Sequence, residues 1–216
     1  MRLSILIATV GERTDRFMDL VATLAPQVQG YKDQIEVLIY WNNFELPISQ
    51  IRQALIEEAR GDYVCFIDDD DSVPPYYCDH IMEAIETNPD QVGWRQQLYW
   101  DGVKTKPTFH SIKYSGWSED VNGYYRECSH LNPIRRDIAL RVPFTGYDGP
   151  EDISWAERVA PLVQTEEYIN EPMYYYYFNS ADSIWNRGKV PDRNYRRPSL
   201  RKPFRYHPDC KSVYTV

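Results

Sequence analysis

The segment ALIEEARGDYVCFIDDDDSVPP, residues 54–75, carries the clearest structural signal of the chain. It begins inside a stretch whose apolar residues have helical spacing, 48–59, and Gly61 is expected to end that helix. The apolar run over 63–67 is typical of a buried strand, and it leads directly into four consecutive aspartates. The segment therefore predicts a helix, a buried strand and a cluster of carboxylates at the end of that strand.

The same alternation of strand and helix extends over residues 1–90. Residues 3–8 and 34–41 are apolar runs typical of buried strands, whereas residues 14–25 and 77–86 have the apolar spacing of helices. This alternation predicts a single α/β domain with a mostly parallel central sheet flanked by helices. In such sheets ligands bind at the carboxyl ends of the strands, which is where the aspartates lie.

The second half of the chain is less regular. We expect strands over 92–100 and 171–178, a helix over 153–160, and turns with short strands over 104–123. The expected domain covers 1–185, with halves over 1–100 and 101–185, and a basic tail follows over 186–216.

The chain is acidic overall but ends in a basic tail. Its 216 residues carry a net charge of −8, and 43% hydrophobic with 26% charged residues fits a soluble globular domain. Residues 185–216 contain nine Lys or Arg and two Asp, so this part carries a net charge of +7 and the rest of the chain carries −15. Such a tail is typical of a segment that closes over a polyanionic ligand such as a nucleoside diphosphate, of an arm along a nucleic-acid backbone, or of a plain solvated tail.

Nothing in the sequence indicates export or membrane insertion. No window approaches 18 consecutive apolar residues, and the apolar run near the N-terminus has only about six, too short for a signal peptide. We therefore expect no membrane span and a cytoplasmic protein. The cysteines form no C-x-x-C pair, which argues against a zinc site or a disulfide framework and predicts free thiols at Cys65, Cys78, Cys128 and Cys210.

The four aspartates over 68–71 point to a divalent cation. Burying several negative charges together costs several kcal/mol each, to order of magnitude, unless a cation compensates. Oxygen ligands at a strand end suit Mg²⁺ or Mn²⁺, which bridge carboxylates to substrate phosphates. The alternative is a solvated, aspartate-rich turn that caps the next helix.

Four segments, in this order, resemble the signature segments of glycosyltransferase family 2. SILIATVGERTDRF resembles its first strand and nucleotide-binding loop, and residues 54–75 resemble its central D-x-D-D signature. The acceptor-side segment of the family, with its Glu-Asp motif, resembles HLNPIRRDIALRVPF followed by GPEDISWAERV. The strand that closes the family's domain resembles EEYINEPMYYYYF. The resemblance covers about residues 1–180. It implies that the half over 1–100 binds the nucleotide sugar and that the half over 101–185 binds the acceptor. It implies a GT-A fold and an inverting enzyme that transfers a sugar from a nucleoside-diphosphate sugar, with UDP as the expected nucleotide.

The resemblance also implies roles on the donor side. Asp70 matches the position that binds Mn²⁺ or Mg²⁺, while Asp68 or Asp69 would hold the ribose or a sugar hydroxyl. The second strand of the family usually ends in an acidic residue that recognises the base, and here the residues over 40–43, Tyr-Trp-Asn-Asn, stand in its place, which leaves the nucleotide open. Nucleotide-sugar contacts are implied for Thr9, Glu12, Arg13, Asn42, Arg52, Asp68, Asp69 and Asp70.

On the acceptor side Asp152 matches the general base of the family. Such a carboxylate takes the proton of an acceptor hydroxyl, while a cation at Asp70 neutralises charge on the leaving phosphate. Glu151, Trp155 and His130 are expected beside the acceptor. Without the resemblance, Glu151 and Asp152 read as first-turn acids that stabilise a helix dipole.

Several histidines and tryptophans have open interpretations. His80 falls in a predicted surface helix and is expected to be structural. His130 would face the acceptor or the donor, and His110 and His207 would complete a metal site, but each also reads as a histidine without a function. The tryptophans have two open interpretations, a stacking platform for an acceptor ring or ordinary core packing, and this applies to Trp94, Trp100, Trp117 and Trp155.

Two other functions compete. A sugar-1-phosphate nucleotidyltransferase shares an α/β architecture and carboxylate-bound metal, but it needs a Gly-rich basic loop, and ATVGERTDR has one glycine. A carbohydrate- or nucleic-acid-binding module without catalysis is the other. The expected acceptors are a glycan, a protein or DNA with a modified base.

Overall fold

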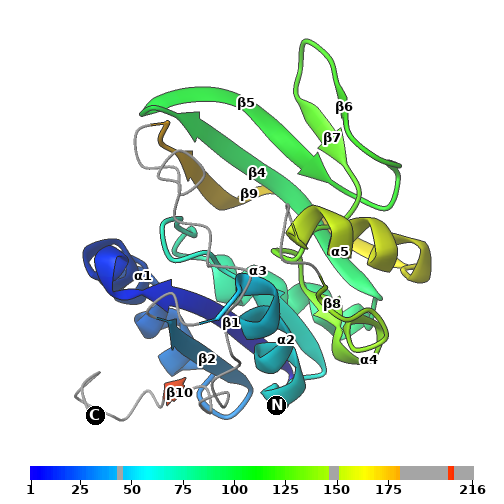
Figure 1. Ribbon diagram of the computed structural model, residues 1–216. Coiled ribbons are helices and arrows are strands. Elements are labelled where there is room, and N and C mark those ends of the chain that lie inside the picture. Colours follow the sequence, from blue (N-terminus) through cyan, green and yellow to red (C-terminus); the bar gives the residue numbers. More distant parts are fainter. Residues whose placement is uncertain (43–45, 146–150, 181–203, 207–216) are drawn as a thin grey trace.

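One ten-stranded sheet runs through the part of the chain that the computed structural model describes, residues 1–42, 46–145, 151–180 and 204–206 (Figure 1). Its strand order is β10-β2-β1-β3-β8-β4-β5-β7-β6, and β9 pairs with β4. This is the mixed α/β architecture that the sequence predicts.

The first three strands form the parallel centre of the sheet. β1 (Leu3–Val10) lies between β2 (Ile35–Asn42) and β3 (Tyr63–Phe66), and both pairs are parallel. α1 (Thr14–Gly30) connects β1 to β2, and α2 (Ile48–Glu58) lies between β2 and β3 in the chain. The carboxyl ends of these strands therefore share one edge.

The second half extends the sheet. β4 (Gln91–Trp100) pairs antiparallel with β5 (Val103–His110) and β8 (Ile134–Arg135), and parallel with the long β9 (Glu166–Phe178). The other elements are η1 (Gly11–Arg13), α3 (Tyr77–Ala84), η2 (Ile85–Thr87), β6 (Ser118–Glu119), β7 (Tyr124–Arg126), α4 (Arg136–Ala139), α5 (Glu151–Val159), η3 (Ala160–Leu162) and β10 (Phe204–Tyr206).

Helices cover both faces of the central strands, which explains why these strands are apolar throughout. Ile5 and Ile7 of β1 pack into a core with Phe17 of α1, whereas Leu6 packs on the opposite face with Leu55 of α2. A strand buried on both faces has no polar alternation. The sequence pattern of β1 is thus a direct consequence of its central place.

Three local features differ from the expectations. α1 continues through Pro26, because the apolar spacing goes on to the buried Val28. α2 ends before Gly61, and a Cβ on Gly61 would lie 2.5 Å from the Ser4 backbone nitrogen, so this glycine permits close packing against β1. β9 begins at Glu166, and Pro172 sits in it where the register with β4 shifts, which is a position that tolerates a missing amide donor.

Most of the expected tail over 186–216 lies outside the described residues. Its residues 204–206 form β10, which pairs antiparallel with β2 and so adds an edge strand to the sheet. We expected no strand over 204–206, but an edge strand offers unpaired backbone groups to any nearby segment.

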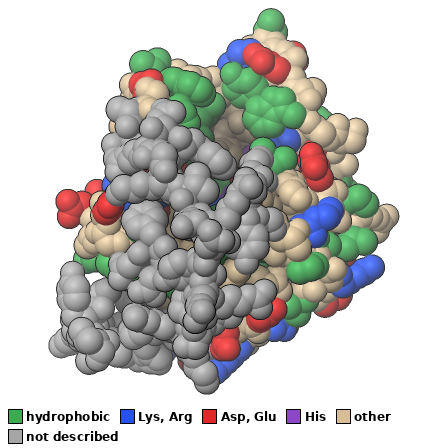
Figure 2. Space-filling view, in the orientation of Figure 1, with side chains coloured by type: hydrophobic (Ala, Val, Ile, Leu, Met, Phe, Trp, Pro, Cys, Tyr) green, Lys and Arg blue, Asp and Glu red, His purple; other side chains and the backbone are tan. Residues whose placement is uncertain are grey.

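Other expectations can be compared with the described residues. Cys65, Cys78 and Cys128 are buried free thiols, as expected, and Cys210 lies outside the described part. Among the helices of the described residues, none has the length and apolar character needed to cross a membrane. Large exposed hydrophobic side chains include Val103, Trp117 and Val121, near the β5 to β7 end of the sheet, where Figure 2 also shows hydrophobic atoms.

Candidate active site

The four aspartates lie directly after β3, at the carboxyl edge of the parallel strands. Asp69 and Asp71 are buried, whereas the side chains of Asp68 and Asp70 keep 31% and 23% of their surface exposed. Asp71 accepts hydrogen bonds from the Tyr174 hydroxyl at 2.9 Å and from the Tyr177 amide at 2.9 Å. The turn therefore has one inward, structural carboxylate and at least two that face the open edge.

Arg13 connects the loop after β1 to this turn. Its Nη1 lies 2.8 Å from Asp69 Oδ1 and 3.1 Å from Asp70 Oδ2. Burial works to lower the pKa of Arg13, but Asp70 and Asp69 outweigh it and raise that pKa. The structure thus brings together the two donor-side segments that the sequence singled out.

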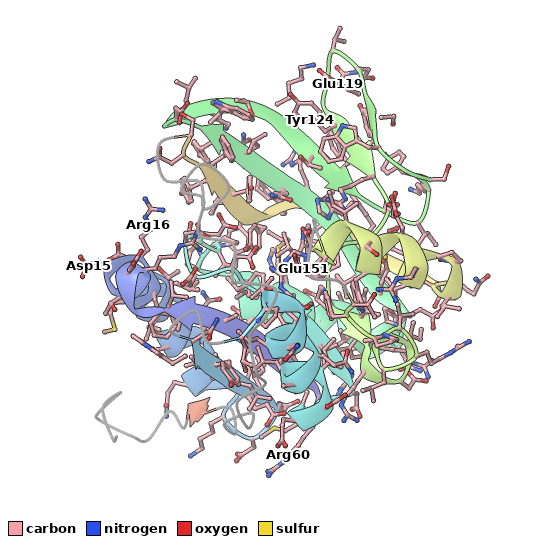
Figure 3. The ribbon with its side chains drawn as sticks, in the orientation of Figure 1. Asp15, Arg16, Arg60, Glu119, Tyr124 and Glu151 are labelled. Carbon is pink, nitrogen blue, oxygen red and sulfur yellow. The ribbon has the colours of Figure 1, made fainter. Side chains whose placement is uncertain are left out.

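Arg52 connects the turn to α5. It is 7% exposed, its Nη2 donates to Asp68 Oδ1 at 2.9 Å, and its Nη1 donates to Glu151 Oε1 at 2.6 Å. Figure 3 labels Glu151 where α5 faces α2. Burial works against ionisation of Asp68, yet Arg52 and His130 hold the pKa of Asp68 well below its usual range. Burial raises the pKa of Glu151, although Arg52 opposes this.

His130 closes the arrangement between the turn and α5. Its Nε2 lies 3.4 Å from Asp68 Oδ2, and its Nδ1 lies 3.9 Å from Asp152 Oδ2. The contacts therefore form a closed ring of five residues. It runs from Arg52 to Asp68, His130 and Asp152, and it returns to Arg52 through Glu151, the sequence neighbour of Asp152. We call these five residues the polar ring.

The two arginines change the argument about charge. Arg13 and Arg52 supply positive charge to three of the four aspartates, Asp68, Asp69 and Asp70. Asp70 is still not fully compensated: burial first, and then Asp68 and Asp69, raise its pKa to about 6 in spite of Arg13.

The chemistry of the aspartate turn suits a cation shared with a substrate. Within the described part of the chain, no three His, Cys, Asp or Glu side chains form a cluster that could hold a metal by themselves. Mg²⁺ is commonly bound by one or two carboxylates together with substrate phosphates. Asp70, an oxygen donor whose ionised form lacks full compensation, fits that kind of site.

The other donor-side residues lie at the same edge but make different contacts. Thr9 is the last residue but one of β1, and it is buried with a hydroxyl that has no partner among the described residues. At the end of β2, Asn42 Nδ2 donates to the Leu46 carbonyl at 3.0 Å, and Asn42 Oδ1 accepts the Leu46 amide at 3.2 Å. Glu12 is exposed in η1.

Trp155 does not lie on an acceptor surface, which corrects our expectation. It is 1% exposed, stacks on Phe144 with ring centroids 4.9 Å apart, and donates its indole N–H to the Val142 carbonyl at 2.8 Å. Trp94 is likewise part of the core, whereas Trp100 and Trp117 are exposed.

Two other histidines have structural surroundings, and His207 lies outside the described residues. His110 is buried with its Nδ1 3.0 Å from Asn132 Oδ1, and burial lowers its pKa to about 3. His80 lies in α3 against the Tyr76 ring. We find no sign in these contacts that His110 completes a site with Asp70.

Sequence reasoning missed Tyr174. This fully buried residue of β9 donates its hydroxyl to Asp71 and accepts the Asp68 amide at 3.0 Å, so it spans the first and last aspartates. The signal that could have found it is the run of four tyrosines over 174–177. Side chains at alternate positions of a strand share a face, so every second tyrosine of this run is expected on the buried face.

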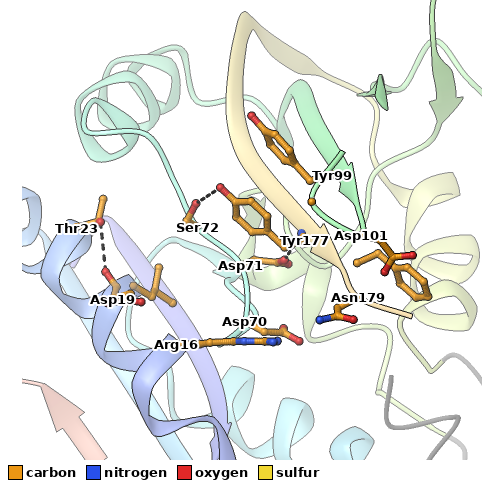
Figure 4. Close-up of a pocket in the computed structure, with 13 residues that line it drawn as sticks. Arg16, Asp19, Thr23, Asp70, Asp71, Ser72, Tyr99, Asp101, Tyr177 and Asn179 are labelled. Carbon is orange, nitrogen blue, oxygen red and sulfur yellow. Dashed lines mark hydrogen bonds between the residues drawn. The ribbon is translucent and has the colours of Figure 1, made fainter. Parts of the chain in front are cut away.

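A cavity of about 600 Å³ borders the turn (Figure 4). Ligand pockets commonly have volumes of roughly 300–1,000 Å³. Of the expected site residues only Asp70 lines it, so the cavity adjoins the polar ring without containing it. Its polar and aromatic lining includes Arg16, Asp19, Asp70, Asp101, Tyr177 and Asn179.

Known proteins share this sequence pattern and this fold. Two curated relatives are the glucosyl-dolichyl phosphate glucuronosyltransferase of Haloferax volcanii, 24% identical over 178 residues, and the putative glycosyltransferase EpsH of Bacillus subtilis, 25% identical over 142 residues. The matches cover 68% and 60% of this chain but 56% and 41% of those proteins, so the chain spans about half their length.

Solved structures of S. aureus TarS have the same fold. TarS 1-349 in complex with UDP-GlcNAc matches with a TM-score of 0.64 and 15% identity, over 83% of this chain and 59% of that chain. Its complex with UDP matches with a TM-score of 0.61 and 14% identity, over 83% and 61%. This likeness confirms the expected GT-A fold.

The family profile described as glycosyl transferase family 2 matches residues 5–141. That range contains the aspartate turn, Arg13, Arg52 and His130, and it ends before Glu151 and Asp152. The match covers well over half of the chain. The chain therefore belongs to glycosyltransferase family 2.

Proposed function

We propose that the protein transfers a sugar from a nucleoside-diphosphate sugar, with UDP as the nucleotide, to an acceptor hydroxyl by a single displacement that inverts the anomeric carbon. The observation that carries this proposal is the polar ring, because it places the donor-side Asp68 and the acceptor-side Asp152 on either side of His130. The shared fold with TarS, which has been solved with UDP and with UDP-GlcNAc, supports the choice of nucleotide.

On the donor side, we assign the diphosphate to the region of Arg13 and Asp70. The guanidinium of Arg13 attracts phosphate oxygens, and Asp70 would hold Mn²⁺ or Mg²⁺ shared with those oxygens. Such a cation, when bound, neutralises the negative charge that develops on the leaving diphosphate. Thr9, Glu12 and Asn42 would surround the base, and Asp68 or Asp69 would accept a hydroxyl of the ribose or sugar.

On the acceptor side, Asp152 is the general base. Arg52 holds Glu151 at 2.6 Å, and Glu151 is only 12% exposed. Asp152 is 32% exposed and lies 3.9 Å from the His130 ring. The acceptor oxygen attacks the anomeric carbon as its proton passes to Asp152. The bond from that carbon to the phosphate oxygen breaks, and the nucleoside diphosphate leaves.

The acceptor is a hydroxyl of a glycan, a protein or DNA with a modified base. The Haloferax volcanii relative is named for a lipid-linked glucosyl phosphate, which makes glycans the first acceptors to test. Most of the basic tail lies outside the described residues. If the tail is a lid, its deletion should weaken donor binding. If it is an arm along DNA, its deletion should abolish a salt-sensitive binding to DNA.

A thermal-shift panel tests the donor side. UDP, GDP, TDP, CDP and ADP are added with and without Mn²⁺ to the wild type and to Asp70→Ala, since a ligand that binds only the folded state raises its stability. We expect one nucleotide, UDP, to give a Mn²⁺-dependent shift that Asp70→Ala loses. No shift with any nucleotide would contradict the proposed donor site.

Turnover tests the chemistry. Release of UDP from UDP-glucose or UDP-GlcNAc, to water or to an added glycan, is expected to fall at least about 100-fold in Asp152→Asn, because general-base catalysis contributes roughly 10²–10⁴-fold. Full turnover by Asp152→Asn would remove Asp152 from the mechanism.

A further inference from the structure

His130 is a buried polar residue whose two ring nitrogens have no hydrogen-bond partner in the described part of the chain. The residue is 5% exposed, and both Nδ1 and Nε2 are inaccessible to solvent. Leaving a buried donor or acceptor unpaired costs about 1–3 kcal/mol, so natural proteins seldom do so without a functional reason. The nearest charged groups to the ring are Asp68 and Asp152, at 3.4 and 3.9 Å.

The protein fixes the position of this ring firmly. The His130 carbonyl accepts the amide of Phe66 at 2.9 Å, which attaches its backbone to the end of β3, and its ring lies against the Phe66 ring with centroids 5.8 Å apart. The surrounding turn is closed by Asn132, whose Oδ1 accepts the Ser129 amide at 2.9 Å. The imidazole is therefore held in place while its hydrogen-bonding capacity is left open.

Asp68 is oriented toward the ring by a second contact. Arg52 occupies Asp68 Oδ1, so that Oδ2 is the oxygen that faces His130 Nε2. On the other side of the ring, Asp152 stands in the first turn of α5 and presents Oδ2 to Nδ1. The gaps of 3.4 and 3.9 Å are both longer than the roughly 2.7–3.2 Å of an N–H···O hydrogen bond. Catalytic contacts in ligand-free enzymes are often long and tighten only in the complex with substrate.

We propose that His130 is a positioning residue that couples the donor side of the site to the general base. In the loaded enzyme the ring is an imidazolium with a proton on each nitrogen, and it donates from Nε2 to Asp68 and from Nδ1 to Asp152. The second contact fixes one oxygen of Asp152 and turns the other toward the acceptor hydroxyl. The inference rests on the proposed function, because it assigns His130 a role through Asp152. It predicts that the two ring nitrogens matter for different kinetic constants.

Substitutions at one position separate the two contacts. The side-chain nitrogen of Asn stands approximately where Nδ1 does, and that of Gln approximately where Nε2 does. His130→Asn therefore keeps a donor toward Asp152, His130→Gln keeps one toward Asp68, and His130→Leu keeps neither. The control is His80→Leu on α3, for which we expect wild-type constants.

The measurement is kcat and KM for UDP release from the UDP-sugar that the wild type uses, with the Kd for UDP from calorimetry. We expect His130→Gln and His130→Leu to lower kcat about 10-fold to 100-fold, the range for partners that orient catalytic groups, and His130→Asn to recover most of that loss. The Kd for UDP should stay within about threefold in His130→Gln. Equal losses in kcat for Asn and Gln, or wild-type kcat in all three variants, would overturn the assignment.

A double-mutant cycle with Asp152 tests whether His130 acts through that carboxylate. Residues in one network give non-additive effects, so His130→Leu should cost far less in the Asp152→Asn background than in the wild type. A fully additive loss would mean a structural role and would overturn the inference. Thermal unfolding of each variant shows whether a loss of folding contributes.

The same experiments distinguish failure of the inference from failure of the proposed function. If the wild type binds no nucleotide, or if Asp152→Asn turns over normally, the proposed function fails and the inference falls with it. If the wild type and Asp152→Asn behave as expected but the His130 variants do not, only the inference fails.

Discussion

Arg52 Nη1 lies 2.6 Å from Glu151 Oε1, although 99 positions separate the two residues in the sequence. The same guanidinium holds Asp68 with its other terminal nitrogen. One buried cation from α2 therefore ties the end of β3 to the start of α5. Asp68, Glu151 and Asp152 together keep the pKa of Arg52 raised, against the effect of its burial.

Removing this cation should destabilise the fold strongly. Arg52→Ala leaves Asp68 and Glu151 without their partner, and breaking a buried ion pair from one side costs about 3–5 kcal/mol. The double variant Arg52→Ala with Glu151→Gln should recover part of that loss in stability, because one of the two unpaired charges is removed. The free energy of unfolding in urea checks both variants; an Arg52→Ala protein as stable as the wild type would contradict the buried pairing.

Asp70→Asn should stabilise the metal-free protein at neutral pH. The folded pKa of Asp70 is about 6, above the ordinary value of 3.8, so the folded state favours the protonated form. The protein therefore loses stability as pH rises from about 4 to 6, by up to about 3 kcal/mol at 1.36 kcal/mol per pKa unit. Asn cannot ionise and avoids this loss.

Urea denaturation in EDTA at pH 4 and at pH 7 measures the effect of Asp70→Asn. The gain over wild type should be present at pH 7 and nearly absent at pH 4. Asp33→Asn, an exposed residue, is the control and should change little at either pH. An equal gain at both pH values would show that ionisation of Asp70 is not the cause.

Tyr174→Phe should loosen the aspartate turn. It removes the hydroxyl that donates to Asp71 and accepts the Asp68 amide, and leaves both buried groups without that partner. We expect a loss of about 1–3 kcal/mol in unfolding free energy and a weaker Mn²⁺-dependent shift with UDP. Tyr125→Phe removes a hydrogen bond to Asp120 at the surface, and this control should stay within about 0.5 kcal/mol of wild type.

Gly61→Ala and Gly30→Ala form a matched pair. A Cβ at Gly61 would meet the Ser4 nitrogen at 2.5 Å, whereas one at Gly30 would meet nothing within 4 Å. Forcing an extra methyl into packed backbone costs about 1–3 kcal/mol, while alanine near a helix end is neutral or gains up to about 1 kcal/mol. Thermal unfolding of the two variants checks the difference; similar melting temperatures would argue against the close approach of Gly61 to β1.

The central strands and the aspartate turn were predictable because their signals are local. β1, β2 and β3 are buried on both faces, so apolar runs mark them directly, and the aspartates follow the third run without interruption. The resemblance to a family picked out Arg52 and Asp152 as separate candidate site residues. Neither kind of argument shows that Arg52 holds Glu151, because side-chain pairing over 99 positions has no periodic signature.

The misplacement of Trp155 has an equally physical cause. It stands close to Asp152 in sequence, but α5 turns Trp155, Ala156 and Val159 to its core side while its first-turn acids face the site. Position within the helix, rather than distance from a catalytic residue in sequence, decides what the indole contacts. Pro172 misled in a related way, since a register shift with β4 accommodates it inside a longer strand.

The polar ring also has a consequence for how the enzyme is made and lost. Three of its members, Arg52, Asp68 and His130, precede α5 in the chain, so a ribosome releases the proposed base after most of the sheet has already been synthesised. Detachment of α5 alone would open the ring while β1 to β4 stay paired. Activity would then vanish before the sheet melts, which makes turnover a more sensitive reporter of early heat damage than circular dichroism of the whole protein.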